Sequence, residues 1–187
     1  MARPRSEQSR RAALGAAVDL VAEGGLAAAT FSAVAARAGV SRVTLYKWWD
    51  SPAALVLDGL LAGTASSVEH DPALAVRDAL AHQLHGLVAL LTDDGRTGAA
   101  LRAVTAQVAA EPGLRADLVE HWLGPRRAVA ADLLRRGQRS GEVRAGVDVE
   151  AAVDVLFAPL YHRLLFGHGP VDDALVEHVL DLFGGFA

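Results

Sequence analysis

The chain has 187 residues, of which 52% are apolar and 5% aromatic, and it contains no cysteine. The lack of cysteine excludes disulfide scaffolds, thiolate zinc sites and iron–sulfur clusters. The apolar fraction is sufficient for a packed core and argues against global disorder. No apolar run reaches the ~18 residues of a membrane span, and the N-terminus lacks the apolar stretch of a secretory signal. We therefore expect a cytoplasmic protein with no membrane partner.

The net charge of −4 is unevenly distributed along the chain. Residues 1–50 carry seven basic and four acidic side chains, whereas the remainder carries 11 basic and 18 acidic ones. A basic segment on an acidic body is typical of a protein with one end that contacts a polyanion. Chance clustering would produce an excess of the same size, so charge alone does not decide between these interpretations.

Apolar residues at three- and four-residue spacing predict helices in the N-terminal third of the chain. These helices are expected over residues 8–23, 30–38, 41–49 and 51–67. Thr30, Ser41 and Ser51 stand where helix N-caps are favoured. Gly39 fits the position after a helix end, and Pro52 is tolerated in a first helical turn.

The rest of the chain continues the helical pattern between turn-forming segments. Further helices are expected over about residues 72–91, 97–110, 113–139, 148–166 and 171–184. No strand-like alternation bounded by hairpin turns is present, so we predict an all-α fold of about nine helices. We place the domain boundary where the charge changes sign, giving an N-terminal domain over residues 1–50 and a helical domain over residues 51–187.

The segment from Thr30 to Leu55 contains two short helices joined by a tight turn. Val34 and Ala35 of the first helix are expected to face inward, and Gly39 gives the turn its backbone freedom. Val40, Leu45 and Trp49 are expected to anchor the second helix to the core, the last two at i, i+4 spacing. At 100° per residue, this arrangement leaves Val43 and Lys47 pointing outward.

The outward side chains of this second helix suit a DNA major groove. Arg42 can donate two hydrogen bonds to a guanine edge, and Val43 can pack on a thymine methyl group. Thr44, Tyr46 and Lys47 can reach phosphate oxygens. Trp48 lies on the flank, where it faces either DNA or solvent.

The segments AARAGVS, TLYKWW and SPAAL, together with the order of the helices around them, resemble the tetracycline-repressor (TetR) family of transcriptional regulators. The specific match covers about residues 8–60. The resemblance implies an N-terminal helix-turn-helix DNA-binding domain and a helical C-terminal domain for ligand binding and dimerisation. It also implies the following DNA-contacting residues: Thr30, Ser32, Arg42, Val43, Thr44, Tyr46, Lys47 and Trp48.

Two positions depart from the family pattern. Val43 stands where the family often has glycine, which implies an unusual base preference. Pro52 stands where the family usually has a phosphate-binding lysine. Either the open N-terminus of the fourth helix or the basic side chains of the N-terminal segment (Arg3, Arg5, Arg10 and Arg11) can replace that charge.

The resemblance further implies an effector cavity in the helical body. Polar groups beside apolar neighbours suit an apolar or aromatic effector. The residues expected to contact it are His82, Leu87, Leu91, His121, Trp122, Phe157 and Tyr161.

A dimer is expected because one short recognition helix is too small a surface for high specificity. The last two helices would pair with their copies, and Pro159 would kink the first of them. Within the set of expected contacts, we assign the interface to Val155, Pro159, Val176, Leu180 and Phe183. The remaining apolar candidates are Ala152, Leu156, Leu160 and Val179.

Two alternative functions remain open on sequence grounds. His82 and His85 have i, i+3 spacing that would suit metal binding in a small helical enzyme, but no third ligand is identifiable. The chain also lacks a nucleophile elbow, a P-loop, a dinucleotide-binding glycine motif and HExxH, so we expect no enzyme, metal or cofactor. A helical protein-interaction module is the second alternative. The preferred interpretation is a dimeric, ligand-responsive repressor that binds a palindromic operator.

Overall fold

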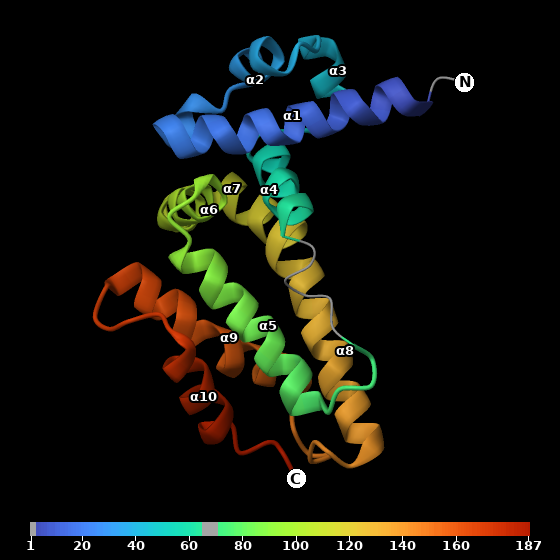
Figure 1. Ribbon diagram of the computed structural model, residues 1–187, viewed down its shortest axis with the longest axis vertical. Coiled ribbons are helices and arrows are strands. Elements are labelled where there is room, and N and C mark those ends of the chain that lie inside the picture. The colour runs from blue at the N-terminus through green and yellow to red at the C-terminus, as the bar shows by residue number, and fades with distance from the viewer. Residues whose placement is uncertain (1–2, 65–70) are drawn as a thin grey trace. The chain divides into compact units, whose positions relative to one another are not determined.

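The computed structural model describes residues 3–64 and 71–187, with side chains described from Ser6 onward (Figure 1). Within these residues the regular elements are helices, and the β-type pairing is an isolated bridge between Val143 and Phe186. The predicted all-α fold is therefore confirmed. The chain divides into two compact units, which we call the head unit (Met1–Thr64 and Asp93–Leu123) and the body unit (Ala65–Thr92 and Gly124–Ala187).

The head unit contains the N-terminal helices and a later segment that packs with them. Its elements are α1 (Arg3–Gly24), the 3₁₀ turn Leu26–Ala28, α2 (Phe31–Ala38), α3 (Arg42–Tyr46), α4 (Pro52–Gly63), α6 (Arg96–Gln107), α7 (Pro112–Leu118) and a π-helical segment (Val119–Leu123). In Figure 1, α1 lies between α2 and α3 on one side and α4 and α6 on the other.

Three predicted N-caps are present in the head unit. The hydroxyl oxygens of Thr30, Ser41 and Ser51 accept hydrogen bonds from the backbone N–H three residues later, over 3.1, 3.1 and 2.9 Å. Each bond satisfies a donor that the first helical turn would otherwise leave without a partner. Gly39 ends α2 with φ 66°, a left-handed conformation that glycine adopts without steric cost. Local chemistry therefore sets the start of α2, α3 and α4.

Some helix boundaries differ from the predictions. The first helix begins at Arg3 rather than at residue 8, and a 2.6 Å ion pair between Glu7 and Arg11 supports its exposed first turns. The third helix ends at Tyr46 rather than Trp49, because the N–H groups of Trp48 and Trp49 both bond to the carbonyl of Leu45 and tighten the chain. The fourth helix ends at Gly63, and its predicted end at Ser67 lies outside the described residues.

The helix predicted over 113–139 is interrupted by the π-helical segment Val119–Leu123. Pro125 follows two residues later and has no N–H to donate to the carbonyl of His121. The regular i→i−4 ladder is therefore broken at this point, and a π segment accommodates the break.

The core of the head unit forms where α1 and α4 cross at Gly59. A Cβ atom at Gly59 would lie 2.8 Å from the carbonyl oxygen of Leu14 and 2.9 Å from Cγ2 of Val18. Only glycine allows the two backbones to approach this closely. Buried side chains from three helices surround the crossing: Ala13, Ala17 and Val21 of α1, Leu55, Val56 and Leu60 of α4, and Leu101 and Val104 of α6.

The described residues of the body unit form four helices. They are α5 (Val76–Thr92), α8 (Gly124–Ser140), α9 (Val149–Phe166) and α10 (Asp173–Leu182). Asp148 and Asp172 cap α9 and α10 by accepting a 2.9 Å hydrogen bond from the backbone three residues later. The apolar stripes of all four helices form the core, which contains Leu80, Leu84, Leu87, Leu91, Leu133, Leu134, Leu156, Leu160, Val176 and Leu180.

The two compact units do not coincide with the predicted domains, 1–50 and 51–187. In the head unit α4 and α6 pack with α1, α7 packs with α4, and the Gly59 crossing joins α4 closely to α1. The division into a DNA-binding and an effector-binding domain remains a functional prediction. Among the described residues, no helix has the length and apolarity needed to cross a membrane.

Candidate nucleic-acid interface

Helices α2 and α3 form a helix-turn-helix unit on a buried support. Val34, Leu45 and Trp49 are buried, as predicted, whereas Val40 is only half-buried. The rings of Phe31 on α2 and Tyr46 on α3 meet edge to face with centroids 4.7 Å apart. This contact and the short turn fix the angle between the two helices.

The opposite face of α3 is open to solvent. Arg42 and Lys47 are exposed, and Val43 and Tyr46 retain 65% and 62% of their surface. The pairs 42/46 and 43/47 have i, i+4 spacing, so the four side chains form one face. A valine this exposed beside a tyrosine is typical of a contact surface.

The other predicted DNA-contacting residues border this face. Thr44 and Trp48 are half-buried, whereas Thr30 and Ser32 of α2 are exposed. The Arg42 Nη1 donates a hydrogen bond of 3.4 Å to the Ser32 hydroxyl, which links α2 to α3. The structure therefore brings all eight predicted residues to the helix-turn-helix unit.

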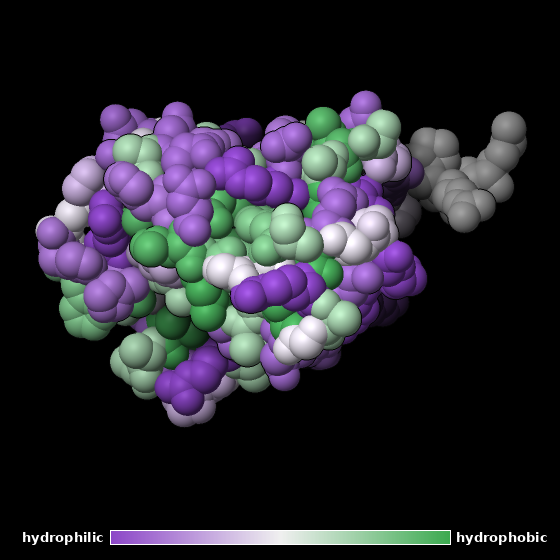
Figure 2. Space-filling model, turned by 90° about the horizontal axis from the view of Figure 1, so that it is seen from below, coloured by the Kyte–Doolittle hydropathy of each residue, from purple (hydrophilic) through white to green (hydrophobic). Residues whose placement is uncertain are grey.

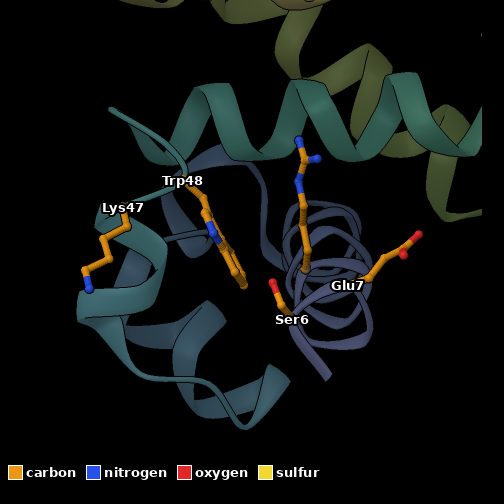
Figure 3. A pocket seen from close by; sticks show the side chains of 5 residues that line it. Ser6, Glu7, Lys47 and Trp48 are labelled. Carbon is orange, nitrogen blue, oxygen red and sulfur yellow. The ribbon is translucent and has the colours of Figure 1, made fainter. Parts of the chain in front are cut away.

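A pocket of about 420 Å³ lies beside this surface, lined by Ser6, Glu7, Arg10, Lys47 and Trp48. Figure 3 shows the Trp48 ring facing Ser6, with Lys47 beyond the ring on one side and Glu7 beyond Ser6 on the other. The Arg10 guanidinium lies over the Trp49 ring, 5.7 Å from its centroid. Glu7 is paired with Arg11, and the Arg10 guanidinium lies 3.7 Å from the Asp58 carboxylate, so Arg10 and Lys47 are the basic side chains that line the pocket.

The N-terminus of α4 was one of two predicted replacements for the family's phosphate-binding lysine. Ser51 caps this end, and its hydroxyl donates a hydrogen bond of 2.5 Å to the carboxylate of Asp117. An acidic side chain at a helix N-terminus occupies the place where an anion would bind. The side chains of Arg3 and Arg5 lie outside the described residues.

The predicted effector-contacting residues are divided between the two units. His121 and Trp122 belong to the head unit, where Trp122 is fully buried and His121 bonds to Asp58. In the body unit, Leu87 and Leu91 are buried and Phe157 and Tyr161 are half-buried. His82 is exposed on α5, so its side chain lies outside the apolar core of the body unit.

Sequence reasoning missed Arg126 on α8 of the body unit. Burial lowers the pKa of this arginine to about 10, and electrostatic interaction with Tyr161 on α9 opposes the shift. Nothing in the local sequence separates Arg126 from the neighbouring Arg127, whose guanidinium pairs with Asp154 and Glu150.

The histidines at 82 and 85 do not converge on a common ligand position. His85 hydrogen-bonds to the carboxylates of Asp173 and Glu177 over 2.7 and 3.3 Å, whereas His82 is exposed. Across the part of the chain that the structure describes, no cluster of three or more histidine or acidic side chains is arranged to hold a metal ion.

Three of the five predicted interface residues, Val176, Leu180 and Phe183, are buried within the body unit of the single chain. The further candidates Ala152, Leu156, Leu160 and Val179 are buried as well. Val155 is 56% exposed and Pro159 is half-buried. Val176, Val179 and Leu180 are buried because α10 has a single apolar stripe, which packs against the rest of the body unit.

Large apolar side chains are nevertheless exposed on the body unit. Leu165 and Phe166 lie at the end of α9, with Phe166 71% exposed, and Leu182 lies at the end of α10. Apolar surface also interrupts the polar surface on the face of the molecule seen in Figure 2. Contiguous exposed apolar patches are typical of interaction sites, whereas single exposed apolar side chains are ordinary.

Two family models match the chain. The model described as bacterial regulatory proteins, tetR family, matches residues 13–58, and the tetracyclin repressor-like C-terminal domain matches residues 73–183. The chain is 33% identical over 185 residues to the uncharacterized HTH-type transcriptional regulator YdeS of Bacillus subtilis, covering 98% of this chain and 92% of that protein. It is 28% identical to the DNA-binding transcriptional repressor TetR of Mycobacteroides abscessus, covering 95% of this chain and 92% of that protein.

A solved structure agrees with these relatives. The crystal structure of the TetR family transcription regulator SCO0332 superposes with a TM-score of 0.81 at 34% identity, covering 96% of this chain and 99% of that one. The members of this family are transcriptional regulators and not enzymes. The helix-turn-helix unit and the exposed face of α3 are consistent with the two family matches. The chain belongs to the TetR family of DNA-binding transcriptional regulators.

Proposed function

We propose that the protein is a homodimeric repressor that binds a palindromic operator and is released from it by a small effector. The exposed face of α3, formed by Arg42, Val43, Tyr46 and Lys47, is the observation that carries this proposal. Leu45 and Trp49 support that face from the core, so it meets DNA as a rigid surface. The Mycobacteroides abscessus relative is named a repressor, which supports repression here. A chromosomal DNA target supports a cytoplasmic location.

In the proposed complex, α3 enters the major groove. Arg42 leaves its 3.4 Å bond to Ser32 and donates two hydrogen bonds to guanine, because that bond is long and easily exchanged. Val43 packs against a thymine methyl group. The surrounding polar side chains contact phosphate and fix the register: Thr30, Ser32, Thr44, Tyr46, Lys47 and Trp48.

The pocket between α1 and α3 replaces the missing lysine at Pro52. Arg10 and Lys47 supply two positive charges beside the reading face, and the Ser6 hydroxyl can donate to a phosphate oxygen. The N-terminus of α4 is a poorer phosphate site because the Asp117 carboxylate is bonded to its cap. We therefore assign the backbone contact to Arg10 and Lys47.

The proposed dimer forms through the outer face of α9. Val155, Ala158, Pro159, His162 and Phe166 fall on one side of this helix at 100° per residue. They are exposed or half-buried in the single chain. Pairing with a second copy would cover this apolar face and place two α3 helices on one DNA site, with half-sites one helical turn or a multiple apart.

The proposed effector is a small apolar or aromatic molecule bound in the body unit. Leu87 and Leu91 provide apolar surface, and Phe157 and Tyr161 are half-buried on α9. Arg126 near Tyr161 keeps its charge at neutral pH, since its pKa of about 10 lies above 7. A half-buried positive charge favours an effector that also carries a hydrogen-bond acceptor or an anionic group.

Selection from a pool of randomised DNA duplexes by the purified full-length protein tests this function. We expect enrichment of an inverted repeat and an affinity that falls steeply as salt concentration rises, because phosphate contacts release counterions. The Arg42→Ala variant serves as the control for the reading face. Failure to enrich any sequence, with DNA affinity independent of salt, would favour a protein-interaction module instead.

A further inference from the structure

Asp58 is the single charged residue of α4, whose sequence is otherwise PAALVLDGLLAG. Its half-buried carboxylate contacts three elements of the head unit. Its Oδ2 accepts a 2.8 Å hydrogen bond from the indole N–H of Trp49, and its Oδ1 lies 2.8 Å from Nδ1 of His121. The guanidinium of Arg10 lies 3.7 Å from Oδ2.

The contact with Trp49 reaches the base of the recognition helix. Trp49 is buried, and its backbone N–H bonds to the carbonyl of Leu45 at 2.9 Å. Its ring meets the Trp48 ring edge to face, with the centroids 5.5 Å apart, and the Arg10 guanidinium lies over the Trp49 ring, 5.7 Å from its centroid. The position of the Trp49 ring therefore sets both the seat of α3 and the pocket that holds Arg10 and Lys47.

The contact with His121 comes from the π-helical segment. A second bond joins the same two regions, since the Ser51 hydroxyl donates to the carboxylate of Asp117. Ser51 and Asp58 are two helical turns apart on α4, whereas Asp117 and His121 are four residues apart in the chain. One face of α4 is thus tied twice to residues 117–121.

Residues 117–121 run directly into α8, which begins at Gly124. A shift of this segment would move His121 and, through their hydrogen bond, the Asp58 carboxylate. Trp49 would then move as well, because its indole N–H donates to the same carboxylate. The carboxylate cannot keep both short hydrogen bonds unless its two partners move together, because each bond tolerates only a few tenths of an ångström.

We infer that Asp58 is a positioning residue that couples the π-helical segment to the recognition helix, so that the place of His121 sets how α3 is presented to DNA. The inference rests on the proposed DNA-binding function. The route runs from His121 through Asp58 to Trp49, and it involves no contact between Asp58 and DNA.

A double-mutant cycle on operator affinity tests this coupling. The probe is the duplex selected by the wild-type protein, and the variants are His121→Ala, Asp58→Ala and the pair combined. We expect each single change to weaken binding by about threefold to about a hundredfold, and the pair to weaken it no more than Asp58→Ala alone. Glu120→Ala, which changes the exposed neighbour of His121, should leave the affinity unchanged. Independent, multiplicative effects of the two changes would overturn the inference.

A second measurement separates this inference from the proposed function. The indole N–H resonance of Trp49, assigned by its loss in Trp49→Phe, is recorded in the free protein. His121→Ala should shift it, while Glu120→Ala should not, and the unfolding midpoint should stay close to that of the wild type. An unshifted resonance in a folded His121→Ala protein would overturn the coupling even if DNA binds. If no DNA is selected, the proposed function fails, and the resonance still decides the coupling. Asp58→Asn, which keeps the side-chain shape, replaces Asp58→Ala if that variant does not fold.

Discussion

Arg42 on α3 and Ser32 on α2 are joined by a 3.4 Å hydrogen bond on the exposed face of the helix-turn-helix unit. The bond holds the guanidinium beside the reading face of α3 in the free protein. Because it is long, it can be exchanged for stronger hydrogen bonds to a base edge at small cost. The Arg42–Ser32 bond is therefore expected in the free protein and is replaced by bonds to a base in the proposed complex.

Replacing Arg42 should lower the affinity for the operator and relax the base preference. We expect Arg42→Ala to weaken binding to the selected duplex by about 1–3 kcal/mol and to relax the preference at one base pair of each half-site. Fluorescence anisotropy with the selected duplex and its single-base variants measures both effects. Unchanged affinity and unchanged base preference would remove Arg42 from the reading face.

Replacing the basic residues of the pocket should act differently. Lys47→Ala and Arg10→Ala each remove a charge that contacts the backbone, so binding to all sequences should weaken alike. The slope of log affinity against log salt should become shallower by about one for each lost phosphate contact. Titrations at several salt concentrations test this, with Arg11→Ala as the control because Arg11 is not among the residues that line the pocket. An equal effect of Arg11→Ala would show that only net charge matters.

The crossing of α1 and α4 predicts a large effect of one methyl group. Gly59→Ala would place a Cβ 2.8 Å from the carbonyl oxygen of Leu14, so it should destabilise the fold by about 1–3 kcal/mol. Gly63→Ala on the same helix meets nothing within 4 Å and should be neutral or stabilising by about 0.5–1 kcal/mol. Urea denaturation compares the two. Equal stability of both variants would contradict the close approach at Gly59.

The outer face of α9 predicts a change of oligomeric state. Val155→Glu or Phe166→Glu places a charge in the proposed dimer interface, so the dimer should dissociate and operator affinity should fall about tenfold or more. Ala89→Glu, at an exposed position on α5, is the matched control. Sedimentation velocity measures the state directly. A dimer that survives both changes on α9 would place the interface elsewhere.

The helix-turn-helix unit could be predicted because its structure depends on local chemistry. Thr30, Ser41 and Ser51 cap their helices as predicted, each hydroxyl oxygen accepting a hydrogen bond from the backbone. The i, i+4 pair Leu45 and Trp49 fixes which side of α3 faces the core. The outward face of α3 follows from that anchor. Each of these features depends on residues within about one or two turns of each other.

Contacts between residues that are far apart in the chain could not be predicted from the sequence. Val176 and Leu180 form an apolar stripe, and a stripe is the same in sequence whether it packs inside the body unit or against a second copy. The partners of Asp58 lie 9 and 63 residues away in the chain, so no local pattern relates them. The lone acid of an apolar helix was the available signal. Chain position alone predicts that His121 and Trp122 lie in the helical body, whereas packing with α4 puts them in the head unit.

Methylation interference on the selected duplex tests the central claim most directly, because it reports which groove α3 enters. Dimethyl sulfate modifies guanine N7 in the major groove and adenine N3 in the minor groove. We predict that methylation of guanine N7 in each half-site blocks binding by the wild-type protein, and that Arg42→Ala loses this interference at one guanine of each half-site. Interference confined to adenine N3, or a guanine pattern identical in the two proteins, would contradict the placement of α3 and Arg42 in the major groove.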